Sequence, residues 1–329
     1  AMGGDGSPKK VIDGIHHHFK NNKNSFYQIF GDKDKILPHI KNNLSNSSFE
    51  IIHTLDIVKG TDSPLEGAKR GKNTSMWLAI QNVKEKKSDV VISAGNTGAL
   101  LVISKLNLNM IENIDKPALS ALWPNKTGMS VVLDLGANIE CSPKNLIDFS
   151  IMGSSLFKSL YPNDNPKVAL LNIGSEELKG NEVIKETYQQ LNKRDNHDFE
   201  FKGYIEGNQL MNGDVNVIVA DGFTGNVALK TAEGTANFIT GELKKAMTGS
   251  IIGKISSLLN ISNLKKFKAR LDPRLYNGAI FIGLDHPVIK SHGGTDYIGF
   301  SNSLSVCTKT VNGDLIEKIR NNILSLIHI

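Results

Sequence analysis

The fold class follows from residues 167–193, which read KVALLNIGSEELKGNEVIKETYQQLNK, and from the apolar run Phe199–Ile205 shortly after them. The stretch starts as a short β-rich run, continues through a polar turn with Gly174 and Gly180, and ends in a segment of helical period. A strand, a turn, a helix and a second strand form a unit in which the two strands are parallel. The same order recurs along the chain, which predicts an α/β fold with three layers, αβα, and a mostly parallel sheet in the middle.

Further apolar runs and helical segments extend this pattern over the whole chain. Strands are expected at Phe26–Phe30, Phe49–His53, Asp89–Ser93, Ala118–Leu122, Ser130–Leu135, Lys167–Ile173, Phe199–Ile205, Val215–Ala220 and Ala279–Ile282. Helices are expected at residues 33–44, 73–86, 97–108, 144–160, 181–193, 223–247 and 293–303, each starting near a residue type that can cap it. No low-complexity linker divides the sequence. We therefore predict a single large α/β domain over residues 1–329, with residues 249–276 as a protruding amphipathic helical arm within it.

The composition is that of a globular protein without a membrane span. The chain has 329 residues, 38 Lys+Arg against 33 Asp+Glu, a formal net charge of +5 and 40% hydrophobic residues. Its longest apolar runs, Met76–Ile80 and Ala99–Ile103, are far shorter than the ~20 residues of a transmembrane helix. Cys141 and Cys307 cannot build a disulfide framework and no signal peptide opens the chain, so a cytoplasmic location is expected. The net charge is mild for this length, and no nucleic-acid partner is expected.

The sequence begins with a glycine turn that has almost nothing before it. Residues 2–6 are Met-Gly-Gly-Asp-Gly and only Ala1 precedes them. A doubly wound sheet normally opens with a strand that leads into its first glycine turn. We therefore expect the first strand of the sheet to be absent from this chain.

Four glycine-bearing turns follow predicted strands and form the candidate site. They are Ala94–Ala99, Asn172–Asn181, Asp221–Asn226 and Ser291–Asp296. Because the carboxyl ends of parallel strands lie along one edge of a sheet, we expect these turns to converge on one crevice. Glycine lets the backbone approach a ligand closely, and the N–H groups of helix N-termini suit an anion, above all phosphate. The alternative is that glycine serves only the geometry of each turn.

Motifs for nucleotides and metals are missing. The sequence lacks Gly-x-x-x-x-Gly-Lys-[Ser/Thr], Gly-x-Gly-x-x-Gly after a strand, Gly-x-Ser-x-Gly and His-Glu-x-x-His. His16–His18 would point in three directions on a helix and cannot chelate one ion, so we expect a solvated helix face there. Cys141 has no neighbouring histidine in the sequence and is expected to be a plain thiol. Neither a cofactor nor a metal is expected.

Six motifs occur in the order seen in one known family. They are Met2–Asp5, Ala94–Ala99, Leu133–Asn138, Gly174–Asn181, Asp221–Asn226 and Lys290–Gly293. On these motifs the chain resembles the PlsX-type phosphate acyltransferases, from its first residue to about residue 320. The resemblance implies the fold of the isocitrate and isopropylmalate dehydrogenases, a homodimer, peripheral attachment to a membrane, and an apolar strand ahead of the first motif.

The resemblance also implies a reaction. A fatty acyl group would move from acyl carrier protein to inorganic phosphate, and the acyl phosphate would pass to a downstream glycerol-3-phosphate acyltransferase for glycerophospholipid synthesis. Negative charge gathers on the phosphate and on the carbonyl oxygen in such a transfer, so fixed donors are needed. Because thiolate leaves readily, no covalent enzyme intermediate is required.

Candidate residues for this chemistry lie in the glycine turns. Lys179 offers a positive charge for the phosphate, and the resemblance suggests Asp221 as its functional partner; the alternative is that Asp221 caps the following helix. His292 either donates to phosphate or the leaving sulfur, or is structural. The candidates for phosphate and substrate binding are Gly95, Asn96, Thr97, Gly98, Asn138, Thr224, Gly225, Asn226 and His292.

The segment predicted to form the arm is basic and amphipathic. Between Leu243 and Leu271 no side chain is acidic and seven are basic, and Asn260–Asn263 is expected to separate two helices. Such an arm suits an anionic membrane surface or the acidic carrier protein. The alternative is a helical hairpin packed on its own subunit or on the dimer partner. The expected contact residues are Ile251, Ile255, Leu258, Leu259, Lys265 and Lys266.

Three other functions fit part of the sequence. A phosphate acetyl- or butyryltransferase acting on acyl-CoA would share the phosphate chemistry, but the basic arm argues against it. A metal- and NAD-dependent decarboxylating dehydrogenase would need clustered aspartates and arginines, which do not occur as a compact group. A non-catalytic acyl- or phosphate-binding module would be distinguished by the absence of turnover.

Overall fold

The computed structural model describes residues 1–41, 44–194 and 198–324. Residues 42–43, at the end of one expected helix, and residues 325–329, at the end of the expected domain, lie outside the described residues. The helices are α1 Lys9–Phe19, α2 Lys33–Ile36, α3 Pro64–Lys69, α4 Ser75–Lys84, α5 Thr97–Asn107, α6 Pro143–Leu160, α7 Glu182–Lys193, α8 Gly222–Thr248, α9 Ile251–Leu259, α10 Ile261–Arg270, α11 Tyr297–Asn312 and α12 Leu315–Leu324.

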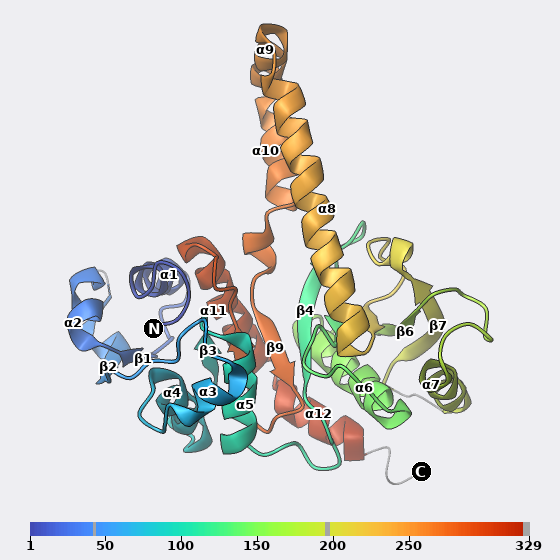
Figure 1. The fold of residues 1–329 in the computed structure, drawn as a ribbon, viewed down its shortest axis with the longest axis horizontal. Coiled ribbons are helices and arrows are strands. Elements are labelled where there is room, and N and C mark those ends of the chain that lie inside the picture. Colours follow the sequence, from blue (N-terminus) through green and yellow to red (C-terminus); the bar gives the residue numbers. More distant parts are fainter. Residues whose placement is uncertain (42–43, 195–197, 325–329) are drawn as a thin grey trace.

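A central sheet with the strand order β3-β10-β9-β4-β5-β8-β6-β7 runs through the molecule (Figure 1). Its strands are β3 Val91–Ser93, β4 Ala118–Pro124, β5 Met129–Leu133, β6 Lys167–Asn172, β7 Glu200–Glu206, β8 Val217–Val219, β9 Ala279–Ile282 and β10 Val288–Lys290. Two further strands, β1 Tyr27–Gly31 and β2 Phe49–His53, form a separate parallel pair. The prediction of an α/β protein with a mostly parallel sheet is confirmed.

Alternate residues of the central strands face opposite sides of the sheet, which explains why these strands are apolar throughout. In β5, Val131 and Leu133 belong to one core with α6, α7 and α12, whereas Val132 belongs to another core beside the start of α8. The same alternation places Val217 and Val219 of β8 in the first core and Ile218 in the second. Both faces of the sheet are therefore covered, as a three-layer fold requires.

The direction of the strands corrects one expectation. β5, β8, β6 and β7 are parallel to one another, and β3 is parallel to β10. The pairings β10–β9, β9–β4 and β4–β5 are antiparallel, so β3 and β10 run opposite to β5, β6 and β8. The carboxyl ends of the strands do not form one row, and the glycine turns that follow them gather in two groups.

Several element boundaries also differ from the sequence prediction. The helix expected at residues 33–44 ends at Ile36 and continues as the 3-10 turn Leu37–His39, because Pro38 cannot extend an α-helix. The helix expected at 293–303 is α11, which begins later because Asp296 caps it by accepting from the amides of Ile298 and Gly299. α3, α12 and the very short β10 were not among the expected elements, and α1 was expected only as a helix around His16–His18, without bounds.

The last helices before β9 extend away from the sheet. Figure 1 shows α8 rising from the body, α9 at its far end and α10 returning beside it. Asn260 separates α9 from α10, as the sequence predicted for this position. Within the described ranges, none of the helices is both long enough and apolar enough to cross a membrane.

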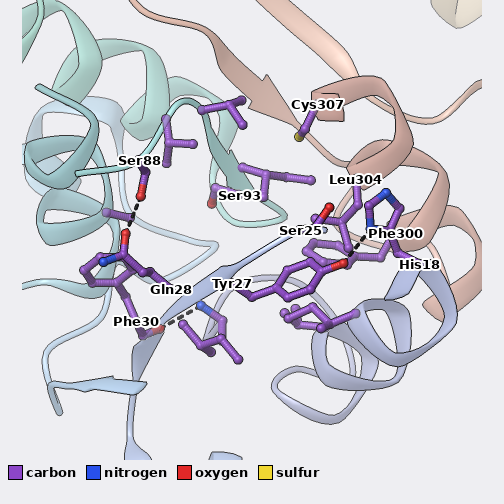
Figure 2. Close-up of a pocket in the computed structure, with 18 of the residues that line it drawn as sticks. His18, Ser25, Tyr27, Gln28, Phe30, Ser88, Ser93, Phe300, Leu304 and Cys307 are labelled. Atoms are coloured by element: carbon purple, nitrogen blue, oxygen red, sulfur yellow. Dashed lines mark hydrogen bonds between the residues drawn. The ribbon is translucent and has the colours of Figure 1, made fainter. Parts of the chain in front are cut away.

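A cavity of about 820 Å³ separates β1 from β3. Figure 2 shows Tyr27, Gln28 and Phe30 of β1 on one side of it, and Ser93 of β3 on the other. Among the described strands, β1 pairs only with β2 and β3 only with β10, so both strands present a free edge to the cavity. The amino group of Ala1 donates to the carbonyl of Phe30 at 2.8 Å at this edge.

We expect an apolar segment joined ahead of Ala1 to pair with both free edges and fill this cavity. Burying even two apolar side chains there contributes about 3–6 kcal/mol, and each kcal/mol raises the Tm of a chain of this size by about 2 °C. The extended protein should therefore melt about 5 °C or more above the present one in a thermal scan. A glycine- and serine-rich extension of equal length is the control. Equal Tm values for the two extensions would show that the cavity is not a strand position.

Candidate functional site

The first group of turns is built around the start of α8. Asp221 caps this helix, because its carboxylate accepts from the amide of Thr224 at 2.8 Å and from the hydroxyl of Thr224 at 2.9 Å. Asp221 therefore makes the contacts of a helix cap, which was the alternative to a functional pairing with Lys179. The residue is half-buried. Thr224 and Asn226 are exposed on the first turn of the helix, and Gly225 is buried beneath them.

The loop after β5 holds α8 in place. Asn138 donates from its side chain to the carbonyl of Pro117 at 2.7 Å and to Asp134 at 2.8 Å, and its own carbonyl accepts from the amide of Gly222 at 2.7 Å. A Cβ on Gly225 would overlap the carbonyl oxygen of Asp134, so only glycine allows this approach. Asn138, a predicted binding residue, therefore positions the helix N-terminus through its backbone and side chain.

Asp134 is the buried acid of this loop. Its carboxylate accepts from the amides of Leu119, Gly136, Ala137 and Asn138 at 2.8–3.2 Å. Burial raises the pKa of Asp134, while these donors lower it. With its oxygens fully engaged, Asp134 shapes the loop.

Lys179 lies in the turn between β6 and α7. Asn172, the last residue of β6, donates to the carbonyl of Lys179 at 3.1 Å, and Gly180 has a φ of +94° that glycine adopts readily. The Lys179 side chain is exposed and lies against Gly174, where a Cβ would be 3.0 Å from its Cγ. Within the described ranges its ammonium group forms no ion pair, and no hydrogen bond joins it to Asp221.

A second cavity of about 530 Å³ connects these segments. Asp221 and Thr224 line it together with Asn181, the cap of α7, and with Cys141. The structure thus brings the turns at residues 174–181 and 221–226 to one cavity. Burial raises the pKa of Cys141 to about 11, and the charges of Asp134 and Asp221 act in the same direction, so the thiol stays protonated at neutral pH.

The second group of turns lies at the carboxyl ends of β3 and β10. Asp5 donates its amide to the carbonyl of Gly293 at 2.9 Å, and a Cβ on Gly4 would lie 2.8 Å from the carbonyl oxygen of Ala94. Three turns, at residues 3–6, 94–98 and 291–294, therefore meet at Gly4. Lys10 and Lys290 lie buried beside this meeting point, and neither was among the site residues expected from the sequence.

The predicted binding residues of the Ala94–Ala99 motif have structural partners here. The Asn96 side chain accepts from the amide of Ala99 at 3.0 Å and donates to the carbonyl of Asp62 at 2.7 Å, so it caps α5 and ties it to a loop. Gly98 packs on Pro64, where a Cβ would lie 2.6 Å from the ring. Gly95 precedes the cap of α5 and donates its amide to the hydroxyl of Ser93 at 3.1 Å. Thr97 is the first residue of α5, where a helix carries unpaired N–H groups.

His292 faces outward from the second group. Its Nδ1 accepts from the amide of Gly294 at 3.1 Å. Partial burial and the positive charge of Lys290 lower the pKa of His292, and the charges of Glu233 and Lys230 on α8 also act on it. The second group of turns therefore lies within electrostatic reach of α8, the helix on which the first group is built.

The histidines of α1 correct a further expectation. His16 and His18 are each only 4% exposed, and only His17 faces solvent. His18 contacts the hydroxyl of Tyr27 at 2.7 Å through Nδ1, and burial lowers its pKa to about 4. The run is mostly core, because α1 packs between β1 and α11. No group of three or more metal-ligating side chains occurs in the part of the chain that the structure describes.

The fold is that of the phosphotransacylases. The chain is similar to EutD phosphotransacetylase from Staphylococcus aureus, with a TM-score of 0.60 at 15% identity over 94% of this chain and 92% of that one. It is also similar to a branched-chain phosphotransacylase from Enterococcus faecalis V583, with a TM-score of 0.59 at 14% identity over 94% of this chain and 98% of that one.

Sequence comparison narrows this class. A family model described as "Fatty acid synthesis protein" matches residues 1–318. The chain is 88% identical over 323 residues to a phosphate acyltransferase of Pelagibacter ubique (strain HTCC1062), covering 98% of this chain and 97% of that protein. It is 43% identical over 324 residues to one of Rhodospirillum rubrum, covering 98% and 93%. The chain belongs to this family of phosphate acyltransferases, which confirms the resemblance found in the sequence.

Proposed function

We propose that the protein transfers a fatty acyl group from acyl carrier protein to inorganic phosphate. Its full-length likeness to phosphate acyltransferases at 88% identity is the observation that carries this proposal. The two groups of glycine turns, each with lysines beside it, supply donors for an acceptor phosphate and for the carbonyl oxygen. The acyl phosphate formed would feed a downstream glycerol-3-phosphate acyltransferase in glycerophospholipid synthesis.

In this proposal a phosphate oxygen attacks the thioester carbonyl and the thiolate leaves. Lys179 extends from an exposed turn without an ion pair among the described residues, so its charge is available to the phosphate. Asp221 lines the cavity beside this turn and orders the first turn of α8, because it accepts from Thr224 and from the amide of Gly225. The exposed side-chain amide of Asn226 on this turn would donate to the substrate. Lys179 and Asp221 are the proposed catalytic pair.

The direct test is incubation with long-chain acyl carrier protein and phosphate, with the acyl phosphate trapped by hydroxylamine. Acetyl-CoA and butyryl-CoA in place of the carrier protein test the phosphate acetyl- or butyryltransferase alternative. Formation of the hydroxamate from acyl carrier protein, dependent on phosphate, is expected. Preferential turnover of the short acyl-CoA substrates would contradict the proposal.

Turnover is expected to require no metal ion and no nucleotide. The turns of both groups are suited to anions, and the sequence lacks the loops that bind nucleotides. The trapped product should therefore form at the same rate in EDTA as in untreated buffer. A rate that falls in chelator and recovers with magnesium would contradict this prediction.

We further propose a homodimer with the fold of the isocitrate and isopropylmalate dehydrogenases, formed by one domain over residues 1–329 with residues 249–276 as its arm. Two large apolar side chains of α8, Phe238 and Ile239, support a subunit contact, because they are 69% and 53% exposed. Large apolar side chains of this kind on a projecting helix favour a protein partner. Crosslinking or sedimentation measures the subunit number.

The tip of the arm is proposed to bind an anionic membrane or the carrier protein, which makes the protein cytoplasmic with peripheral membrane association. The apolar side chains of α9 are exposed and share one helical face: Ile251, Ile252, Ile255, Leu258 and Leu259. Lys265 and Lys266 of α10 are exposed beside them. An apolar face flanked by lysines fits an interface between water and anionic lipid.

A further inference from the structure

Two lysines are buried at the second group of turns. Lys10 of α1 is 7% exposed, and Lys290 at the end of β10 is 8% exposed. The Nζ of Lys10 donates to the carbonyl of Gly293 at 2.6 Å, and the Nζ of Lys290 donates to the carbonyl of Ser291. Both ammonium groups are therefore held by one short turn, although the residues come from opposite ends of the chain.

These two charges lack a buried counter-charge. Over the described residues, neither lysine forms an ion pair, and the acid that acts on Lys10 is Asp5, which is exposed. Burial lowers the pKa of Lys290 to about 8, and the positive charge of Lys10 adds to this effect. Burying two neighbouring cations is unfavourable unless an anion offsets them. Two buried ammonium groups without a buried counter-charge therefore indicate a binding site for a negatively charged ligand.

The main chain approaches the ammonium group of Lys10 closely. At Gly4 a Cβ would lie 2.9 Å from the Nζ of Lys10 and 2.9 Å from the carbonyl oxygen of Gly293, so no side chain can stand there. Gly4 and Gly6 have φ values of +84° and +69°, which glycine adopts without strain. The glycine turns at residues 3–6 and 291–294 thus place main chain against the two ammonium groups, which suits a compact anion.

We infer that Lys10 and Lys290, with the turns at residues 3–6 and 291–294, form a binding site for a phosphate group. The assignment of that phosphate rests on the proposed function and has two sources: the inorganic phosphate that accepts the acyl group, or the phosphate ester in the prosthetic arm of the carrier protein. His292, exposed above the two lysines, is in position to contact the same group.

Binding of inorganic phosphate to the complete chain tests the site without any acyl substrate. Lys290→Met and Lys10→Met should each weaken phosphate affinity about 10- to 100-fold by calorimetry, the scale of one lost hydrogen bond to a charged group. Each variant should also melt at or above the wild-type Tm in phosphate-free buffer, because one of two repelling buried charges is gone. Lys9→Met, which removes an exposed lysine paired with Asp13 at 2.6 Å, is the matched control and should bind as wild type.

The source of the phosphate is read from two further measurements. A raised KM for inorganic phosphate assigns the site to the acceptor, and a lost preference for carrier protein with its prosthetic arm over carrier protein without it assigns the site to the donor. Unchanged affinity of both variants for inorganic phosphate and for the carrier protein would overturn the inference, as would a Tm lowered in both variants with phosphate affinity intact. Absent turnover with lysine-dependent phosphate binding would instead refute the proposed function alone.

Discussion

Lys179→Ala is expected to lower the rate of acyl transfer to phosphate by roughly 10²–10³-fold, the scale of one removed electrostatic donor. The side chain is exposed in the turn between β6 and α7 and has no ion pair among the described residues, so its removal leaves no buried group unsatisfied. Thermal unfolding and circular dichroism should therefore match the wild type. The measurement is the rate of hydroxylamine-trapped acyl phosphate at saturating acyl carrier protein.

Lys185→Ala is the matched control for this experiment. Lys185 lies on α7, the helix that follows the turn of Lys179, and pairs with Glu182 at 3.1 Å. Its substitution by alanine removes one positive charge, as Lys179→Ala does. A surface ion pair of this kind contributes little. Full activity of Lys179→Ala would identify Lys179 as an ordinary surface lysine. An equal loss of activity in both variants would show that the rate depends on the net charge of this region and not on Lys179 itself.

Leu258→Glu is expected to abolish sedimentation of the protein with anionic vesicles while leaving activity on soluble substrates nearly unchanged. Leu258 is 70% exposed on α9, far from both groups of turns, and Lys254 lies on the same helix. Each basic group near an anionic surface contributes about 1 kcal/mol, and a carboxylate placed in the apolar face opposes both this attraction and the burial of that face. Vesicles with and without anionic lipid give the measurement.

Leu55→Glu controls for the added charge, because Leu55 is 69% exposed and lies outside the arm. It should sediment with anionic vesicles as the wild type does. Size-exclusion chromatography of both variants separates membrane binding from subunit contact. A Leu258→Glu protein that is monomeric and inactive would make the arm a dimer element and contradict the membrane interpretation.

The layers of the fold were predictable because they are encoded locally. Strands β5, β6 and β8 are short apolar runs whose alternate residues serve two cores, and glycine and cap residues mark where each helix begins. The family was predictable as well, because its motifs are contiguous in the sequence. The short strand β10 was not predicted.

The way in which the glycine turns gather in two groups was not predictable from local sequence. The single row of strand ends that we expected is absent from the described sheet. The pairings β10–β9, β9–β4 and β4–β5 are antiparallel, so β3 and β10 run opposite to β5, β6 and β8. Strand direction depends on pairing between distant segments, and no local pattern reports it. The sequence suggested Asp221 as the partner of Lys179 and left a helix cap as the alternative, and its bonds to Thr224 are those of a cap.

Local patterns were enough to predict the α/β class, the positions of most strands and helices, the glycine turns and the family. Tertiary packing was needed to show which turns lie together, that His16 and His18 belong to the core, and that Lys10 and Lys290 donate to the same turn. The bond from Lys10 to Gly293 spans a sequence separation of 283 residues. Periodicity, capping and turn chemistry act over a few neighbours, whereas burial of a charge beside another is set by the packing of the whole chain.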